Sequence, residues 1–444
     1  MNRIQLLVLL ALACGASCQA AVTLQVTSSV HHEPLKNVTK SPADSKSTLY
    51  VTLADDYILT KSDRATTIYD FKNRRRVVMD GASKTYVDYS LFDTAGFRVF
   101  EMRNRIGMNA MLAKLNTELK PFRKVDLEQE LSLAEDSATV IDASTSGDAL
   151  TFSSEGSPLA TWSKHGAKAS AYDVAHFAQL LRYTQSVHPQ VLAKLAEGGV
   201  IPDSLTFTVS TTMAVSTVNV SVEQVKSATP PAYTLQGYTR RQAAPAQGAI
   251  NALMDRMAAQ TPEQLAALRA AHPCDTEADY RADQLLDTML GRVECTLSTG
   301  ASMLPFTPPQ LEQMRASTPV SLTFSATSVT KKEEFAAAVS TLSGLRNQAP
   351  RKAYILKLFE ANNRARLGQY QESDHLFAEV LEANPVLGGA WKDLGDLMIM
   401  RFDTPSAWRS WDIGRRIAPT LPNFAFVNQL ESEIAKRHPE YLVY

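Results

Sequence analysis

Two short residue patterns and a set of scattered histidines are the features of this chain that could carry catalytic or metal chemistry. His31 and His32 are adjacent, Ser328 and Lys331 have S-x-x-K spacing, and single histidines occur elsewhere, at His165, His176, His188 and His272. Neighbouring side chains seldom aim at one metal ion, and the companion motifs of S-x-x-K enzymes are missing. The sequence lacks G-x-S-x-G, H-E-x-x-H, phosphate-loop and C-x-x-C motifs. We therefore expect no catalytic residue, metal or cofactor. The alternative is a hydrolase whose site only the fold assembles.

The first twenty residues have the composition of a secretory signal peptide. Arg3 precedes the uncharged run IQLLVLLALA, and small residues follow up to Ala20. The run is shorter than the roughly 20 apolar residues that cross a membrane, and no later segment qualifies. We predict cleavage after Ala20 and a periplasmic or secreted protein without a transmembrane segment. A lipid anchor at Cys14 or Cys18 is the alternative.

Cys274 and Cys295 are the two cysteines that such cleavage would leave. In an oxidising compartment a disulfide is the default expectation, and the chain-entropy model values its loop at roughly 3 kcal/mol. One observation opposes it: residues 276–290 look helical, and such a helix would span about 22 Å, whereas bonded Cα atoms lie within about 7 Å. We predict the Cys274–Cys295 bond, with two free buried thiols as the alternative.

The elements that must position any site fall into a sheet-rich part and a helical part. Charge is balanced, with 45 Lys and Arg against 46 Asp and Glu in 444 residues, so nothing favours nucleic acid as a partner. Strand-like alternation dominates residues 23–227, a stretch rich in Pro, Gln and Ala covers 228–248, and helical spacing follows. We predict an α+β fold with a half-barrel-like antiparallel sheet domain (23–227), a helical middle region (246–303) and a helical repeat domain (331–444).

Turn residues and apolar spacing predict individual elements of the sheet-rich part. The segment AYDVAHFAQLLRYT reads as a helix, and a longer helix should precede Pro121 because apolar residues recur at helical spacing from Phe100 onward. Three strand reversals are expected where turn-forming pairs occur, at Asp55-Asp56, Lys72-Asn73 and Asp80-Gly81.

Two stretches near the end of the sequence have the same spacing of helix-packing positions, although few of their residues are identical. They end in Pro385 and Pro419, which are 34 residues apart. The positions 15, 12, 8 and 5 residues before each proline lie on one helix face, and they carry Tyr370, Ser373, Phe377 and Val380 in the first stretch and Thr404, Ala407, Trp411 and Gly414 in the second. A third copy before Pro350 has a fitting second helix only, because residues 320–329 read as strand or loop. The pattern predicts helix pairs, each ended by its proline.

A 34-residue period of helix pairs resembles the tetratricopeptide repeat, whose first helix carries W, L and G where this sequence has Trp391, Leu394 and Gly395. The resemblance covers roughly a quarter of the chain, and the helix 424–436 would cap the stack. It implies that the first helices line a groove for a peptide or protein segment. By helical spacing, the polar lining would be Asn362, Arg366, Lys392 and Asp396. The alternatives are a solvated helix face and an unrelated helical bundle, and the family's basic clamp for a carboxylate is not reproduced.

The run TIYDFKNRRRVVMDGASKTYVDYS, residues 67–90, is similar to strands of periplasmic lipoprotein-carrier-like domains. That resemblance implies a half-open barrel whose concave face accepts an acyl chain or an apolar protein segment; the alternative is an interior filled by its own side chains. The function we expect is an exported protein-binding scaffold or adaptor that uses the repeat groove, in bacterial envelope assembly. A periplasmic lipid or lipoprotein carrier is the alternative.

Overall fold

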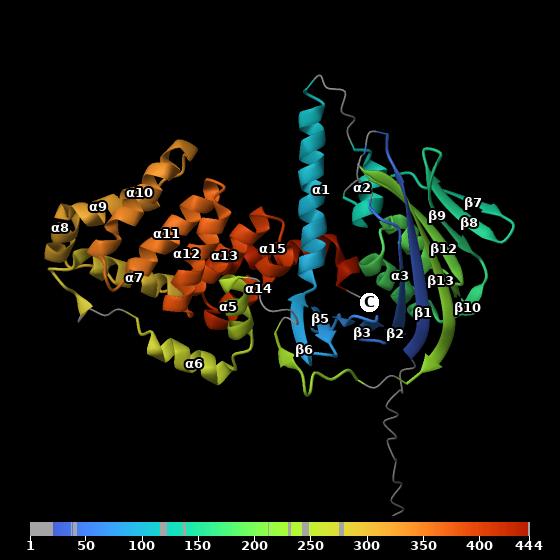
Figure 1. The fold of residues 1–444 in the computed structure, drawn as a ribbon, viewed down its shortest axis with the longest axis horizontal. Helices are drawn as coiled ribbons and strands as arrows, with labels where there is room; N and C mark the ends of the chain where they lie inside the picture. The colour runs from blue at the N-terminus through green and yellow to red at the C-terminus, as the bar shows by residue number, and fades with distance from the viewer. Residues whose placement is uncertain are drawn as a thin grey trace, which may run out of the picture.

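The structure is a computed structural model that describes residues 21–36, 38, 42–115, 122–135, 139–211, 213–229, 232–241, 248–274 and 279–442. An open, curved sheet forms one half of the molecule and an array of helices the other, so the predicted α+β class is confirmed (Figure 1). The predicted signal peptide, Cys14, Cys18 and Pro121 lie outside the described residues. Among the helices that the structure describes, none is long and apolar enough to cross a membrane.

The sheet has twelve strands, and all neighbours pair antiparallel except β14 and β6. Its spatial order is β14-β6-β5-β4-β3-β2-β1-β13-β12-β9-β8-β7, so the first strand lies at the centre beside a strand about 200 residues later. The strands are β1 (Ala21–Pro34), β2 (Ser45–Leu53), β3 (Tyr57–Lys61), β4 (Thr66–Asp70), β5 (Arg75–Asp80), β6 (Thr85–Ser90), β7 (Asp142–Ser146), β8 (Ala149–Ser154), β9 (Ser157–Ser163), β12 (Ser204–Ser210), β13 (Ala214–Ala228) and β14 (Thr239–Arg240). A separate pair is formed by β10 (Gly166–Lys168) and β11 (Val200–Pro202). The three predicted reversals are confirmed as the β2–β3, β4–β5 and β5–β6 turns.

The inner face of the sheet is covered by helices of the same half. Strand β1 buries every second residue, Val22, Leu24 and Val26, as a strand with one covered face must. Helix α3 (Ala171–Thr184), which spans the predicted segment, lies inside the curve of the sheet, and its Tyr183 packs against Tyr69 of β4 (Figure 1). The remaining helices of this half are α1 (Phe92–Leu112), α2 (Lys124–Leu131) and α4 (Pro189–Ala196).

The helical half is a row of antiparallel helices that begins after residue 248. Its members are α5 (Ala249–Ala258), α6 (Pro262–Ala271), α7 (Leu285–Thr299), α8 (Pro308–Ala316), α9 (Thr318–Thr327), α10 (Phe335–Leu345), α11 (Ala353–Arg366), α12 (Tyr370–Ala383), α13 (Gly388–Met400), α14 (Thr404–Ile417) and α15 (Ala425–Arg437). Helices α11 and α12 pack as one hairpin and α13 and α14 as the next, and the second helices begin 34 residues apart, at Tyr370 and Thr404. The period in the sequence is therefore a period of helical hairpins.

Aromatic and small residues interlock within the α13–α14 hairpin. Trp391 and Trp411 are 0% and 1% exposed. A Cβ atom on Gly395 would lie 2.9 Å from Cε2 of Trp411, and one on Gly414 would lie 2.5 Å from Cζ of Phe424 and 3.0 Å from Cβ of Trp391. Because the indole of Trp411 fills the space that a missing side chain leaves on the facing helix, the two helices approach closely. Other members of the predicted pattern are also buried, namely Phe377, Leu394 and Ala407, and Tyr370 is half-buried.

The incomplete third copy is a correction to the sequence analysis. Residues 320–329 were expected as strand or loop, yet Thr318–Thr327 is helix α9, which packs against α10 as a further hairpin. Its β-branched residues favour a strand locally. Pro319 at the first turn and the burial of Val320, Thr323 and Ala326 along one face favour the helix instead, so tertiary packing overrides propensity.

The predicted Cys274–Cys295 bond is present, with the two Cα atoms 4.9 Å apart. The opposing argument fails because the helix expected over residues 276–290 is shorter than predicted. Residues 280–284 are not helical, and α7 begins only at Leu285 and carries Cys295 in its last two turns. The apolar residues that suggested the helix lie in α7.

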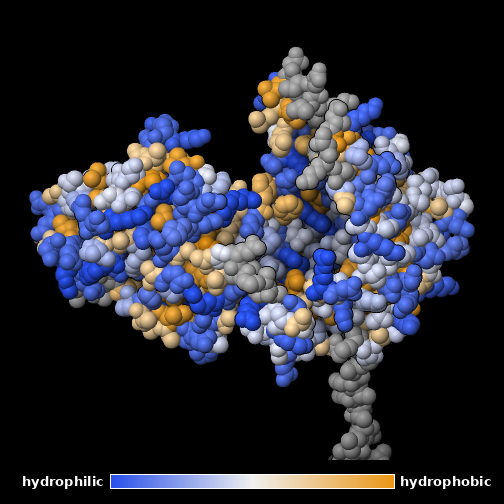
Figure 2. Space-filling model, in the orientation of Figure 1, coloured by the Kyte–Doolittle hydropathy of each residue, from blue (hydrophilic) through white to orange (hydrophobic). Residues whose placement is uncertain are grey.

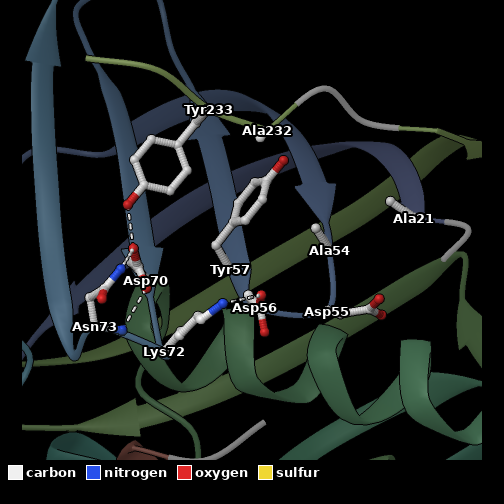
Figure 3. Close-up of a pocket in the computed structure, with 10 residues that line it drawn as sticks. All are labelled: Ala21, Ala54, Asp55, Asp56, Tyr57, Asp70, Lys72, Asn73, Ala232 and Tyr233. Carbon is white, nitrogen blue, oxygen red and sulfur yellow. Dashed lines mark hydrogen bonds and ion pairs between the residues drawn. The ribbon is translucent and has the colours of Figure 1, made fainter. Parts of the chain in front are cut away.

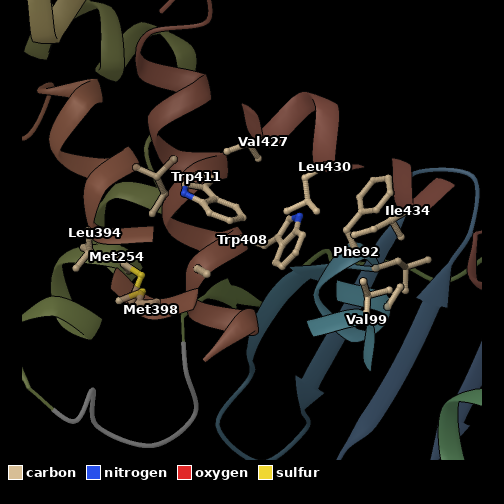
Figure 4. Packing of buried hydrophobic residues seen from close by; sticks show 14 of the residues in the cluster. Phe92, Val99, Met254, Leu394, Met398, Trp408, Trp411, Val427, Leu430 and Ile434 are labelled. Atoms are coloured by element: carbon tan, nitrogen blue, oxygen red, sulfur yellow. The ribbon is translucent and has the colours of Figure 1, made fainter. Parts of the chain in front are cut away.

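The two halves share one apolar core where α14 and α15 meet α1 (Figure 4). Trp408 of α14 is fully buried and faces Gly96 of α1, whose missing side chain leaves room for the indole. At the edge of this contact Arg75 of β5 donates to Asp412 of α14 at 2.6 Å. Helix α15 therefore ends the hairpin stack, as predicted for a cap, and also joins the stack to the sheet half.

The segment after α15 continues into the sheet half. Tyr441 is 0% exposed, and its hydroxyl donates to the carbonyl of Ser132 at 2.6 Å and accepts from Arg98 at 2.7 Å. The guanidinium groups of Arg98 and Arg182 each lie 5.3 Å from the centre of its ring. Residues from α1, α3 and the end of α2 thus surround one side chain from the other end of the sequence.

Candidate functional site

One cavity of about 420 Å³ lies between the first helices of the last two hairpins, α11 and α13, and reaches the end of α9. The four residues predicted from spacing, Asn362, Arg366, Lys392 and Asp396, all line it. The reason is helical geometry: Asn362 and Arg366 are four residues apart on α11, as are Lys392 and Asp396 on α13, so each pair shares a face. Their role in binding stays a prediction.

The charged groups of this groove are held in different ways. Lys392 pairs with Asp396 along α13. Arg366 lies over the ring of Phe335, 5.2 Å from its centre, and donates to the carbonyl of Val329 at 3.4 Å. Lys392 and Asp396 are thus paired with each other, whereas Arg366 is exposed and contacts the segment between α9 and α10.

Asp393 is a lining residue that the sequence analysis missed. Its Oδ2 accepts a hydrogen bond of 2.8 Å from Nδ2 of Asn362, which links α13 to α11 across the groove. The available signal was its spacing, because Asp393 lies three residues before the predicted Asp396 and such positions share a helix face. The sequence analysis named only Lys392 and Asp396, which are four residues apart on this helix.

Burial makes the two carboxyl groups of α13 unusual. Removal from water raises the pKa of Asp393 to about 6, against the lowering effect of the Asn362 hydrogen bond, and the nearby charge of Asp396 adds to the rise. Burial also raises the pKa of Asp396, although its pair with Lys392 works in the opposite direction. Burial thus raises the free energy of the ionised form of Asp393, and a positive charge beside the carboxylate would lower it.

The short patterns noted in the sequence do not form a site. His31 and His32 lie on strand β1 rather than in a loose terminus, and their rings contact Asp44 and Ser216 separately, each at 2.8 Å. Ser328 donates to the carbonyl of Phe324 at 2.7 Å, whereas Lys331 lies 3.9 Å from Glu334. In the part of the chain that the structure describes, no cluster of His, Cys, Asp or Glu could hold a metal ion.

The scattered histidines have structural surroundings of their own. His188 is fully buried, accepts a hydrogen bond at Nδ1 from the backbone of Gln190, and therefore donates from Nε2 to Glu128 at 3.0 Å. His176 is buried in α3, His165 lies on the surface 3.2 Å from Asp148, and His272 ends α6. The structure places them in separate elements.

A second hollow, of about 340 Å³, lies at the end of strands β3 and β4 (Figure 3). Asp70 is its central residue, 3% exposed, and its carboxylate accepts from the hydroxyl of Tyr233 and from Nδ2 of Asn73 at 2.8 Å. Lys72 lies 3.7 Å from Asp56. The hydrogen bond from Tyr233 fastens the stretch after β13 to strand β4.

Apolar side chains gather at the projecting end of α1 (Figure 2). Ile106, Met108 and Met111 are between 43% and 64% exposed. This end leads into residues 116–121, which lie outside the described residues.

The groove is therefore the feature in which spacing, polar contacts and an internal space coincide. A scan of protein-family models and a search of curated proteins find no match to this chain.

Proposed function

We propose that this protein is an adaptor that binds an extended segment of another protein in the groove between α11 and α13. The observation that carries the proposal is that residues from two successive hairpins converge on one cavity with both polar and apolar walls. Binding sites of this kind combine apolar surface with a few placed polar groups. A rigid stack of hairpins presents such a groove without reorganising on binding, which keeps the entropic cost low.

Two further features support an extracytoplasmic adaptor. The Cys274–Cys295 bond suits an oxidising compartment, and the amino-terminal residues have the pattern of a signal peptide. We propose that the protein acts in the bacterial periplasm, in assembly of the envelope, and that the sheet half holds the hairpin array in place through α1 and Tyr441.

Site-specific crosslinking tests the groove directly. A photoreactive benzophenone amino acid replaces Met400, a rim residue that is 53% exposed; the matched control replaces Phe426, which is 61% exposed on α15 and lies outside the lining. We expect a crosslink in cells from position 400 and none from position 426. Mass spectrometry identifies the crosslinked segment, and a synthetic peptide of that sequence must bind the purified protein.

Charge reversal gives the second measurement. The pair Arg366→Glu and Lys392→Glu should weaken binding of that peptide by at least about tenfold, because both groups face the groove, while the melting temperature changes little. Arg437→Glu, on the exposed face of α15, is the control and should bind like the wild type. Equal crosslinking from both positions, or unchanged affinity after charge reversal, would remove the groove as the binding site.

A further inference from the structure

Asp393 is a carboxylate of the groove that has no counter-ion among the described residues. In that part of the chain Lys392 pairs with Asp396, yet no lysine or arginine nitrogen lies within 4.0 Å of Asp393. Asp393 accepts a hydrogen bond from the neutral amide of Asn362. Carboxylates in such half-buried positions are usually paired, so this one is suited to a cation that arrives from outside.

Arg366 also lines the groove, but its guanidinium contacts other groups than the carboxylate of Asp393. Its guanidinium stacks on Phe335 and donates to the carbonyl of Val329, on the side of the groove formed by the end of α9 and the start of α10. It lowers the pKa of Asp393 only through longer-range attraction. The charged groups that act on Asp393 are therefore Arg366, Lys392 and Asp396, and none of them is its direct partner.

Apolar side chains form part of the wall of the cavity that holds this carboxylate. Phe359 of α11 and Leu397 and Met400 of α13 line the same cavity. A lysine or arginine side chain has an aliphatic stem and a charged end, so it fits a space with apolar walls and an acidic group. Met400 is unbranched and 53% exposed, which lets it adjust to such a stem at the rim.

We propose that the groove binds its partner segment through one lysine or arginine side chain, whose stem lies against Phe359, Leu397 and Met400 and whose charged end pairs with Asp393. This inference rests on the proposed function, because it names the chemistry of the segment that the groove would take. The hydrogen bond from Asn362 holds the carboxylate in position for that pair. Arg366 and Lys392 at the sides are then placed for backbone carbonyls or an acidic neighbour of the basic residue.

Peptide selection followed by a double substitution tests the pairing. A display library of short random peptides is selected on the wild-type protein and counter-selected on the Arg366→Glu, Lys392→Glu variant. We expect the recovered peptides to share a lysine or arginine. Replacing that residue by norleucine in a synthetic peptide should weaken binding about tenfold or more, and Asp393→Asn should weaken binding of the original peptide by a similar factor.

The norleucine peptide should bind the wild-type protein and Asp393→Asn with equal affinity, because it has no charged side chain to pair with Asp393. Glu433→Gln, an exposed acidic residue of α15, is the matched control and should leave every affinity unchanged. Affinity of the basic peptide should also fall as the pH drops through about 6, where Asp393 takes up a proton, and Asp393→Asn should abolish that dependence.

The outcomes separate this inference from the proposed function. Groove-dependent peptides that lack a basic residue, or an affinity that Asp393→Asn leaves unchanged, would overturn the lysine or arginine pairing and leave the adaptor proposal standing. Acidic peptides that depend on Arg366 would reverse the proposed chemistry. Recovery of no groove-dependent peptide, together with no crosslink from position 400, would refute both. If Asp393→Asn failed to fold, the norleucine peptide would still decide the matter on the wild-type protein.

Discussion

At the scale of single residues, the notable feature is the carboxylate of Asp393, a charge on α13 that is not paired with a cation of the described residues. Asp393 accepts from Asn362 and has no counter-ion within 4.0 Å among the described residues, while its neighbour Lys392 is satisfied by Asp396. An uncompensated, half-buried carboxylate lowers stability when ionised. We interpret this loss of stability as a consequence of keeping the carboxylate available for binding.

The pH dependence of stability tests this reading. The pKa of Asp393 rises from the ordinary 3.8 of an aspartate to about 6 in the folded protein, so its contribution to stability is fully present below about pH 4 and is lost as the pH rises through 6. Asp393→Asn keeps an acceptor for Asn362 and carries no charge. It should raise the melting temperature by about 2 °C at about pH 8 and leave it unchanged near pH 4. Differential scanning fluorimetry at the two pH values measures this, with Glu433→Gln as control. An equal shift at both values would contradict it.

At the scale of elements, the close approach of the helices in the α13–α14 hairpin depends on aromatic residues of one helix that meet glycines of the other. Trp411 occupies the space beside Gly395, and Trp391 lies against Gly414. The same logic explains why α9 is helical despite its β-branched residues, since burial of one face against α10 outweighs local propensity. Packing between hairpins decides which local preferences are kept.

Paired glycine substitutions check the interlocking. Gly395→Ala would place a methyl group against the indole of Trp411, and we expect it to lower the free energy of unfolding by about 1–3 kcal/mol. Gly344 lies at an exposed position of helix α10, where a new methyl group would have no atom within 4 Å. Gly344→Ala should therefore raise the free energy of unfolding by about 0.5–1 kcal/mol. Chemical denaturation followed by circular dichroism compares the two. Similar effects from both substitutions would refute close packing at Gly395.

At the scale of the whole molecule, the sheet half and the helical half are joined by contacts from distant parts of the sequence. Trp408 packs against Gly96 of α1, Arg75 donates to Asp412, and Tyr441 is buried among residues of the sheet half. A continuous apolar core runs through this junction. We expect the two halves to unfold together in the native protein.

Substitutions within one helix test that coupling. Gly96→Ala would bring a methyl group to 2.8 Å from Cζ3 of Trp408, so it should loosen the junction and lower stability by about 1–3 kcal/mol. Gly107→Ala in the exposed part of the same helix meets no atom within 4 Å and should be neutral or stabilising. In calorimetry, Gly96→Ala should broaden or split the unfolding transition. A single transition that Gly96→Ala leaves unshifted would show that packing of Trp408 against Gly96 does not stabilise the junction.

The sequence by itself determined what depends on neighbours along the chain. Turn residues located three strand reversals, and apolar spacing located α3 and the two hairpins α11–α12 and α13–α14. It also indicated the helix faces that meet in the groove, because positions four residues apart on a helix always share a face.

Tertiary structure alone decided what depends on residues far apart. The helix expected over residues 276–290 begins only at Leu285, and the strand or loop expected over 320–329 was wrong, because tertiary packing sets the bounds of α7 and α9. The missing counter-ion of Asp393 and the burial of Tyr441 likewise follow from contacts between separate elements. Periodicity encodes which face a residue occupies, whereas the identity of the atoms opposite that face is fixed only when the elements pack.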